Sequence, residues 1–237
     1  MISRYRIRCI TENDYVYKWS STVPTECPNN PVHVIDSTSI AIIEFLPPKV
    51  QEVVWISKDG FIYGGSTGSL QDPKVDYIRL YCGNVTNRES YIWSKDKFQE
   101  FVQVGYSVSV ELLIYNLVSV VNQNIWLRFS GSTSVPPSET ADHFGWKIIG
   151  QRIWASNANG SSQTISDTGF DVPSGENMTQ LNMKLNVGAN LEFYINGNSK
   201  VIHDTNLPVL DPYLHLHIKT LEDVAKEIYI GRVLVEK

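Results

Sequence analysis

The sequence predicts an all-β protein dominated by an antiparallel β-sandwich, and three features of its second half support that fold class. Residues 190–195 alternate apolar and polar side chains, Asn-Gly follows at 196–197, and residues 200–202 resume the alternation. Asn-Gly between alternating runs is typical of a two-residue type I′ hairpin, because both central positions of that turn need a positive φ. Further strand patterns close the chain at residues 213–219 and 228–235. Strands joined by polar turns in this way favour a sandwich.

The first 46 residues are expected to form a small N-terminal β module. Its strands are predicted at residues 3–10, 14–19, 32–34 and 39–45. The intervening segment 24–31 contains too many proline and asparagine residues for regular structure. Pro47-Pro48 is the expected end of the module, because paired prolines interrupt regular structure.

Residues 47–73 are expected to connect this module to the sandwich, which is predicted to span residues 74–237. Within the connecting segment, residues 50–56 have a strand pattern. Residues 94–102 and 220–227 fit short capped helices. The strands predicted in the sandwich cover residues 75–81, 90–93, 106–115, 125–129, 144–149, 152–155, 183–187, 191–195, 200–203, 213–219 and 228–235. Polar loops are expected at residues 131–142 and 157–176.

The composition favours a folded protein that does not coat nucleic acid. Hydrophobic residues make up 42% of the 237 residues and aromatic residues 11%, which is enough for a sizeable core. The formal net charge of −5 argues against nucleic-acid binding, which requires a basic surface. No segment approaches the roughly 20 apolar residues of a membrane-spanning helix, and the first residues lack the apolar core of a secretory signal. We therefore expect neither a nucleic-acid partner nor membrane insertion.

The three cysteines are too few for a disulfide framework. Cys9 and Cys27 could form one disulfide if their segments are adjacent, whereas Cys82 has the setting of a buried strand residue. Cys9, Cys27 and His33 could instead bind a metal, but the C-x-x-C spacing typical of structural zinc is absent. The sequence therefore predicts no metal site and no cofactor.

The sequence does not predict an enzyme. Glycan hydrolases built on β-sandwiches need two carboxylates on one face, about 5 to 10 Å apart. Glu111 and Glu192 could meet across a sheet, but the Glu-x-Asp-x-x-Glu pattern of laminarinase-type glucanases is absent. No nucleophile elbow occurs, and the glycine-rich segment 64–68 lacks the lysine and the helix of a phosphate-binding loop. We therefore interpret these carboxylates as solvated.

The polar faces of the predicted strands carry side chains that could contact a carbohydrate. Aromatic rings stack on the apolar C–H faces of sugars, and the alternative for each tryptophan is a place in the core. His215 and His217 point the same way on one strand and could also ligate a metal, although a polar sheet face is the simpler interpretation. The candidate glycan contacts are Trp126, Trp154, Tyr194, Arg128, His215 and His217.

Two stretches of the sequence resemble known protein families. The first consists of residues 5–12, 15–20, 24–30 and 33–36, which read YRIRCITE, YVYKWS, PTECPNN and HVID. It resembles an N-terminal module of structural proteins from phages and large DNA viruses. The second consists of residues 144–146, 153–155, 191–197, 205–208 and 228–231. It resembles concanavalin A-like (laminin-G-like) jelly rolls, including those of viral surface proteins.

These resemblances imply a non-enzymatic virion structural protein, such as a minor capsid, vertex or fibre component, that presents a lectin-like jelly roll. A carbohydrate-binding module for host attachment is the alternative, and a glycan hydrolase is a remote one. The implied partners are other virion or capsid proteins, host surface glycans and further copies of the chain in a homo-oligomer. The implied location is the particle surface, after assembly in the host cell. The calcium ligands of legume-type lectins have no counterpart in the sequence.

Overall fold

The computed structural model describes residues 3–20, 23–42, 52–54, 61–65, 70–73, 78–98, 107–116, 121–134, 136–173 and 175–236. All regular secondary structure in these segments is β-strand, which confirms the all-β fold class. None of the described segments contains a helix long and apolar enough to cross a membrane.

The N-terminal residues form a small antiparallel sheet in the order β3-β1-β2, from β1 (Ser3–Cys9), β2 (Asp14–Ser20) and β3 (Ile35–Ile42). Alternation along β1 turns Tyr5, Ile7 and Cys9 toward a small core. Val16 and Cys27 complete that core, and Ile35 and Ile40 pack against it. Residues 32–34, predicted as a strand, are instead a turn and its exit into β3.

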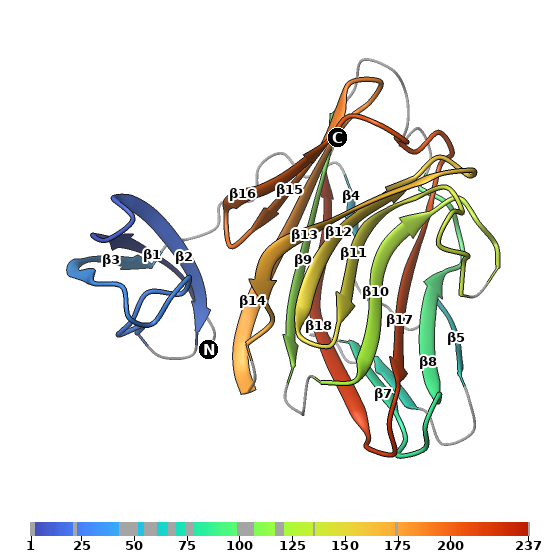
Figure 1. Ribbon diagram of the computed structural model, residues 1–237, viewed down its shortest axis with the longest axis horizontal. Coiled ribbons are helices and arrows are strands. Elements are labelled where there is room, and N and C mark those ends of the chain that lie inside the picture. The colour runs from blue at the N-terminus through green and yellow to red at the C-terminus, as the bar shows by residue number, and fades with distance from the viewer. Residues whose placement is uncertain are drawn as a thin grey trace.

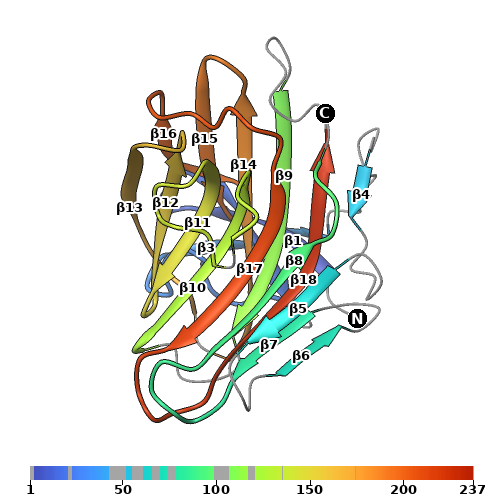
Figure 2. The same ribbon diagram turned by 90° about the vertical axis from the view of Figure 1, so that its right-hand side faces the viewer.

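Seven strands form one sheet of the sandwich, in the order β13-β12-β11-β10-β17-β8-β5 (Figure 2). Their bounds are β5 (Phe61–Gly65), β8 (Glu89–Ser94), β10 (Gln123–Ser130), β11 (His143–Ile149), β12 (Arg152–Ala158), β13 (Gln163–Asp171) and β17 (Tyr213–Thr220). Every pairing between neighbours in this sheet is antiparallel.

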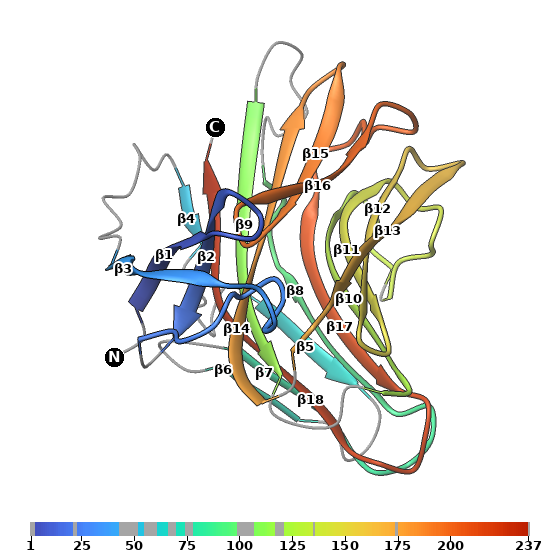
Figure 3. The same cartoon turned by 60° about the vertical axis from the view of Figure 1, so that its left-hand side comes forward.

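The second sheet faces the first (Figure 1). Its strands are β4 (Glu52–Val54), β6 (Leu70–Pro73), β7 (Ile78–Cys82), β9 (Ser107–Asn116), β14 (Gly175–Asn186), β15 (Asn190–Ile195), β16 (Asn198–His203) and β18 (Lys226–Glu236). The strands β6-β7-β18-β9-β14 lie side by side, β15 and β16 follow on from β14, and β4 pairs with β18. The N-terminal sheet joins this sheet through β2, where Trp19 pairs with Met178 of β14 (Figure 3).

The main core lies between the two sheets of the sandwich. Trp146 of the seven-stranded sheet is fully buried and meets Phe193 of the other sheet edge to face, with 4.9 Å between ring centroids. Leu191, Phe193 and Ile195 all point into this core, as the alternation of the hairpin predicts. Glu192 lies on the opposite face of its strand, where it is half-buried.

The Asn-Gly hairpin forms as predicted. Asn196 has a φ of 54° and Gly197 a φ of 83°, the positive values that a type I′ turn requires. Ile195 pairs with Asn198, so the loop contains only these two residues. The Asn196 side chain also accepts a hydrogen bond from the Gln180 backbone N–H at 3.0 Å, which ties the turn to β14.

Both predicted helices are wrong in the described part of the chain. Residues 94–98 contain the end of β8 and a bend, while residues 99–102 lie outside the described segments. Residues 220–227 contain the turn between β17 and β18, where the Thr220 hydroxyl donates to the carbonyls of Glu222 and Val224. A capping residue can close a tight turn as well as a helix, so the capping pattern was ambiguous.

Two other segments contain strands that the sequence pattern did not predict. Residues 163–171, placed in a loop, form β13, an edge strand whose side chains alternate only between half-buried and exposed. Because β13 buries no apolar face, hydrophobic alternation could not reveal it. In the expected connecting segment 47–73, β4 lies within the strand predicted at residues 50–56, whereas β5 and β6 are additional strands, and all three pair with strands of the sandwich.

Candidate functional site

The outer face of the seven-stranded sheet brings together five of the six candidate glycan contacts. Alternation along β10 points Ile125 and Leu127 into the core and Trp126 and Arg128 outward. The strand register then aligns side chains across the sheet, roughly perpendicular to the strands. One transverse row consists of Trp154, Lys147, Trp126, His217 and Tyr91, on β12, β11, β10, β17 and β8.

A second transverse row runs beside the first, from Ser156 through Gly145, Arg128 and His215 to Trp93. The position of Gly145 in this row has no room for a side chain. A Cβ atom at this position would lie 2.4 Å from the Leu127 carbonyl oxygen and 2.6 Å from the Arg128 Cβ, far inside van der Waals contact. The glycine therefore allows the arginine side chain to lie against β11.

The loop after β10 covers the centre of this face. Arg128 donates hydrogen bonds to the carbonyls of Pro137 and Ser138, and His215 Nε2 lies 3.2 Å from the Ser132 carbonyl oxygen. Lys147 forms an ion pair with Glu139 of the same loop. As a result, Arg128 is only 1% exposed and His215 only 2%, so these two predicted contacts are buried by the protein's own loop.

Burial sets the electrostatics of this covered centre. Removal from water, which penalises the charged form, lowers the pKa of Arg128 to about 10. Burial, together with the nearby Arg128 charge, lowers the pKa of His143 and of His215 to about 4 each. Both imidazoles are therefore neutral at pH 7. His143 is held in place by the Ala141 carbonyl and the Ser156 hydroxyl.

The Trp126 ring contacts the side chains of Arg128 and Lys147. Arg128 Cζ lies 4.4 Å and Lys147 Nζ 4.5 Å from the centroid of its ring, which are cation–π distances. The side chain is only 6% exposed. A sugar would have to displace these cations and the loop to stack on the ring.

Accessible aromatic side chains lie beside the covered centre. We define the aromatic platform as Tyr91, Trp93 and Tyr213, all of which are half-buried. Trp93 lies 5.8 Å from Tyr213 and 5.3 Å from His215 between ring centroids, and Lys97 Nζ lies 5.5 Å from the Tyr213 centroid. Gly64 of β5 leaves room for Tyr91, whose ring occupies the space of a Cβ there. The alternation of residues 89–94 places Tyr91 and Trp93 on the face opposite the core, but these two residues were not among the candidates predicted from the sequence.

The remaining candidates are Trp154 and His217 on the same face and Tyr194 on the other sheet. Trp154 is half-buried at the β12 end of the first row. His217 is nearly buried, and its Nε2 lies 3.2 Å from Glu89, whose pKa the hydrogen bond lowers. Tyr194 is on the outer face of the other sheet, where it donates to Glu192, and this hydrogen bond raises the pKa of Tyr194 to about 12. Tyr194 therefore does not share a site with the tryptophans.

Among the described residues, the carboxylates at the face of the seven-stranded sheet pair with basic side chains, Glu89 with His217 and Glu139 with Lys147. Strands β10, β11, β12 and β17 contain no Asp or Glu. Asp167 and Asp171 of the edge strand β13 pair with Arg152. Glu111 and Glu192 lie on the other sheet with β14 between their strands, and each accepts hydrogen bonds from side-chain amides.

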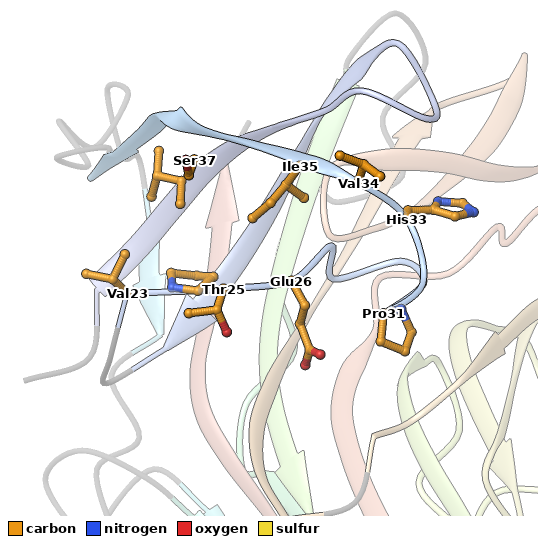
Figure 4. A pocket seen from close by; sticks show the side chains of 10 residues that line it. Val23, Thr25, Glu26, Pro31, His33, Val34, Ile35 and Ser37 are labelled. Atoms are coloured by element: carbon orange, nitrogen blue, oxygen red, sulfur yellow. The ribbon is translucent and has the colours of Figure 1, made fainter.

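The cysteines of the N-terminal module are free in the structure. Cys9 and Cys27 are buried next to each other, and Cys82 is buried in the sandwich core. The Cys9–Cys27 disulfide stays a prediction. A pocket of about 550 Å³ also opens on this module, with Val23, Thr25 and Ser37 at one end and Pro31 and His33 at the other (Figure 4).

Comparison with known proteins identifies the fold. The sequence matches no protein-family model and no curated protein. The metal-free carbohydrate recognition domain of Emp46p matches with a TM-score of 0.58 at 10% identity, over 80% of this chain and 94% of the other. A β-1,3-1,4-glucanase (lichenase) from a mouse hindgut metagenome matches with a TM-score of 0.55 at 12% identity, over 78% and 97% of the two chains. A glycosidic hydrolase gives a TM-score of 0.55 at 10% identity, over 76% and 91%.

These likenesses show a concanavalin A-like jelly roll, the fold that lectin carbohydrate recognition domains and glycoside hydrolases share. They bear out the jelly-roll part of the sequence resemblance and give no support to its viral part. The fold alone does not decide between binding and hydrolysis, because both occur on it.

Proposed function

We propose that this protein is a non-enzymatic, lectin-like module that binds a carbohydrate on the aromatic platform of Tyr91, Trp93 and Tyr213. The observation that carries the proposal is the accessible aromatic cluster on the outer face of the seven-stranded sheet. Aromatic rings bind the C–H faces of sugars, and nearby polar groups bind the hydroxyls. Two polar groups lie near the platform: Lys97 is beside Tyr213, and Glu89 pairs with His217, the neighbour of Tyr91 across the strands.

Two observations favour binding over hydrolysis. Hydrolysis of a glycosidic bond needs two carboxyl groups on opposite sides of that bond, about 5 to 10 Å apart. Of the five inner strands of this sheet, β10, β11, β12 and β17 contain no carboxyl group, and the single carboxyl group of β8, Glu89, pairs with His217. In addition, the loop that contacts Arg128, His215 and Lys147 occupies the centre of the face, where a polymer would otherwise lie.

A binding module of this kind fits the host-attachment alternative that the sequence suggests. The similarity of the fold to a carbohydrate recognition domain and to a glucanase supports a carbohydrate as the ligand. The virion location, the capsid partners and the homo-oligomer stay predictions from the sequence resemblance.

A glycan array followed by calorimetry on the best ligand tests the proposal. We expect Trp93→Ala to weaken binding roughly tenfold or more, the equivalent of about 1.4 kcal/mol. Tyr194→Ala is the matched control, because Tyr194 is a half-buried aromatic residue on the other sheet, and it should bind like the wild type. No ligand on a broad array, or equal losses in the two variants, would contradict the proposal. Release of reducing ends from β-glucan by the wild type would contradict its non-enzymatic part.

A further inference from the structure

Four side chains with metal-binding chemistry meet in the N-terminal module. Cys9 ends β1, Glu12 lies in the turn to β2, and Cys27 and His33 come from the loop before β3. One ligand atom from each of the four residues lies within 4.8 Å of all the others. The two cysteines are buried, and the side chains of His33 and Glu12 are 25% and 26% exposed.

We infer that Cys9, Glu12, Cys27 and His33 form a tetrahedral site for zinc. Two thiolates, one imidazole and one carboxylate are ligands that zinc accepts in structural sites with four protein ligands. The inference is independent of the proposed carbohydrate binding, which concerns the other end of the fold.

The distances in the cluster suit a tetrahedral metal. In a tetrahedral zinc site, neighbouring ligand atoms are roughly 3.3 to 3.8 Å apart, given Zn–S and Zn–N lengths of about 2.3 and 2.0 Å. Cys9 Sγ lies 3.8 Å from His33 Nδ1, and His33 Nδ1 lies 3.0 Å from Glu12 Oε1. No separation in the cluster exceeds 4.8 Å, which is about 1 Å above the tetrahedral value.

The backbone around the four ligands is already held in place. The Ile10 N–H donates to the Val34 carbonyl at 2.8 Å, and the Val34 N–H donates to the Thr11 hydroxyl at 3.0 Å. These bonds tie the β1–β2 turn, which carries Glu12, to the segment that carries His33. Within the loop, the His33 N–H donates to the Asn30 carbonyl at 3.0 Å.

Groups around the ligands orient them as the outer shell of a metal site does. The Asn29 side chain donates to Glu12 Oε2 at 2.8 Å, which leaves Oε1 directed at His33. The backbone N–H groups of Asn29 and Asn30 hydrogen-bond the Cys27 sulfur and favour its thiolate, although burial raises the pKa of that thiol. Bound zinc would reverse the effect of burial, because a coordinated thiol is deprotonated.

The spacing of the ligands is a short sequence pattern, Cys-x-x-Glu at residues 9–12 followed by Cys-x₅-His at residues 27–33. The first half matches the two-residue spacing of a zinc knuckle, with a glutamate in place of the second cysteine. The sequence interpretation tested only for C-x-x-C, and for that reason it did not include Glu12.

A cross-link would also add stability that the small core of the N-terminal module does not supply. Its core contains few buried apolar side chains, and units of about 40 residues or fewer usually require a disulfide, a metal or a partner to fold. A metal at this position would join the β1–β2 turn to the loop that carries Cys27. That loop lies against the jelly roll, across a pocket of about 200 Å³ that Cys27, Pro28, Met178 and Asn196 help to line.

Metal analysis of the full-length protein, purified under reducing conditions, tests the inference. We expect about one zinc ion per chain and a loss of most of that zinc in Cys27→Ser and His33→Ala. Cys82→Ala is the matched control, because Cys82 is the third buried cysteine but lies in the sandwich core, and it should keep the zinc.

A second measurement on the wild type guards against variants that fail to fold. After removal of zinc with a chelator, added Co²⁺ should give the visible absorption of a tetrahedral site and the ultraviolet charge-transfer band of cobalt thiolate. Wild-type protein that contains no zinc and gives no such spectrum would overturn the inference. A thiol titration of the unfolded protein that finds only one free cysteine would also overturn it, in favour of a Cys9–Cys27 disulfide.

Discussion

The N-terminal module and the jelly roll are stabilised in different ways. In the jelly roll, inward side chains of two sheets interdigitate in one continuous core that includes Phe129, Trp146 and Phe193. In the N-terminal module the buried core is small, and a polar cluster of cysteine, histidine and glutamate lies beside it. Because a three-strand sheet buries little apolar surface, it gains more from a local cross-link, such as the proposed zinc site, than a two-sheet sandwich does.

The largest expected effect comes from breaking the jelly-roll core. Trp146→Ala should lower the free energy of unfolding by about 3 to 5 kcal/mol, because it removes a fully buried ring that contacts Phe193. Urea denaturation followed by circular dichroism measures this loss. The variant should still bind zinc in whatever fraction is folded. A loss below about 1 kcal/mol would show that the two sheets are not packed as described.

A second effect on stability is expected from acid, and it should fall on the jelly roll. His143 and His215 have pKa values near 4 in the folded protein, below the ordinary value of 6.5. Between these values the unfolded chain binds more protons than the folded one, so stability falls as the pH drops from about 6.5 toward 4.

Unfolding free energies of the chelator-treated protein across this pH range measure the effect without a contribution from metal release. His215→Gln should show a shallower decline than the wild type, because one of the two depressed groups is gone. An equal slope in both proteins would contradict the burial of His215 beneath the loop.

The smallest effect is expected at the Asn-Gly hairpin. Asn196→Ala should cost roughly 1 to 2 kcal/mol, because alanine is strained at a positive φ and cannot accept the hydrogen bond from Gln180. Asn198→Ala, two residues later and outside the positive-φ positions, is the control and should cost less. Thermal unfolding compares the two variants, and an equal cost would show that the turn conformation is not the cause.

The regular part of the fold followed from the sequence. Alternation placed Leu191, Phe193 and Ile195 in the core and predicted the turn at residues 196–197, because both depend only on neighbours in the chain. The strand β13 could not be found, since it is a polar edge strand. The helix predicted at residues 220–227 failed because the Thr220 hydroxyl accepts a hydrogen bond from the Glu222 N–H, as a helix cap would, but also donates to the carbonyls of a tight turn.

The candidate site was less predictable, because it depends on contacts between distant segments. Alternation correctly placed Trp126 and Arg128 on the outer face of their strand. It could not show that the loop of residues 131–142 folds back over that face and buries them. Likewise, Glu12 is three residues after Cys9 in the sequence, but its place beside His33 depends on the pairing of β1 with β3.

Hydrogen exchange of the full-length protein, with zinc and after chelation, tests most directly whether the two regions are stabilised separately. The account predicts faster exchange after chelation within residues 3–42, most of all in the β1–β2 turn and the loop that carries Cys27 and His33. Exchange in the strands of the jelly roll should stay unchanged. Identical exchange with and without zinc throughout the N-terminal module would contradict the account, and so would an equal increase in both regions.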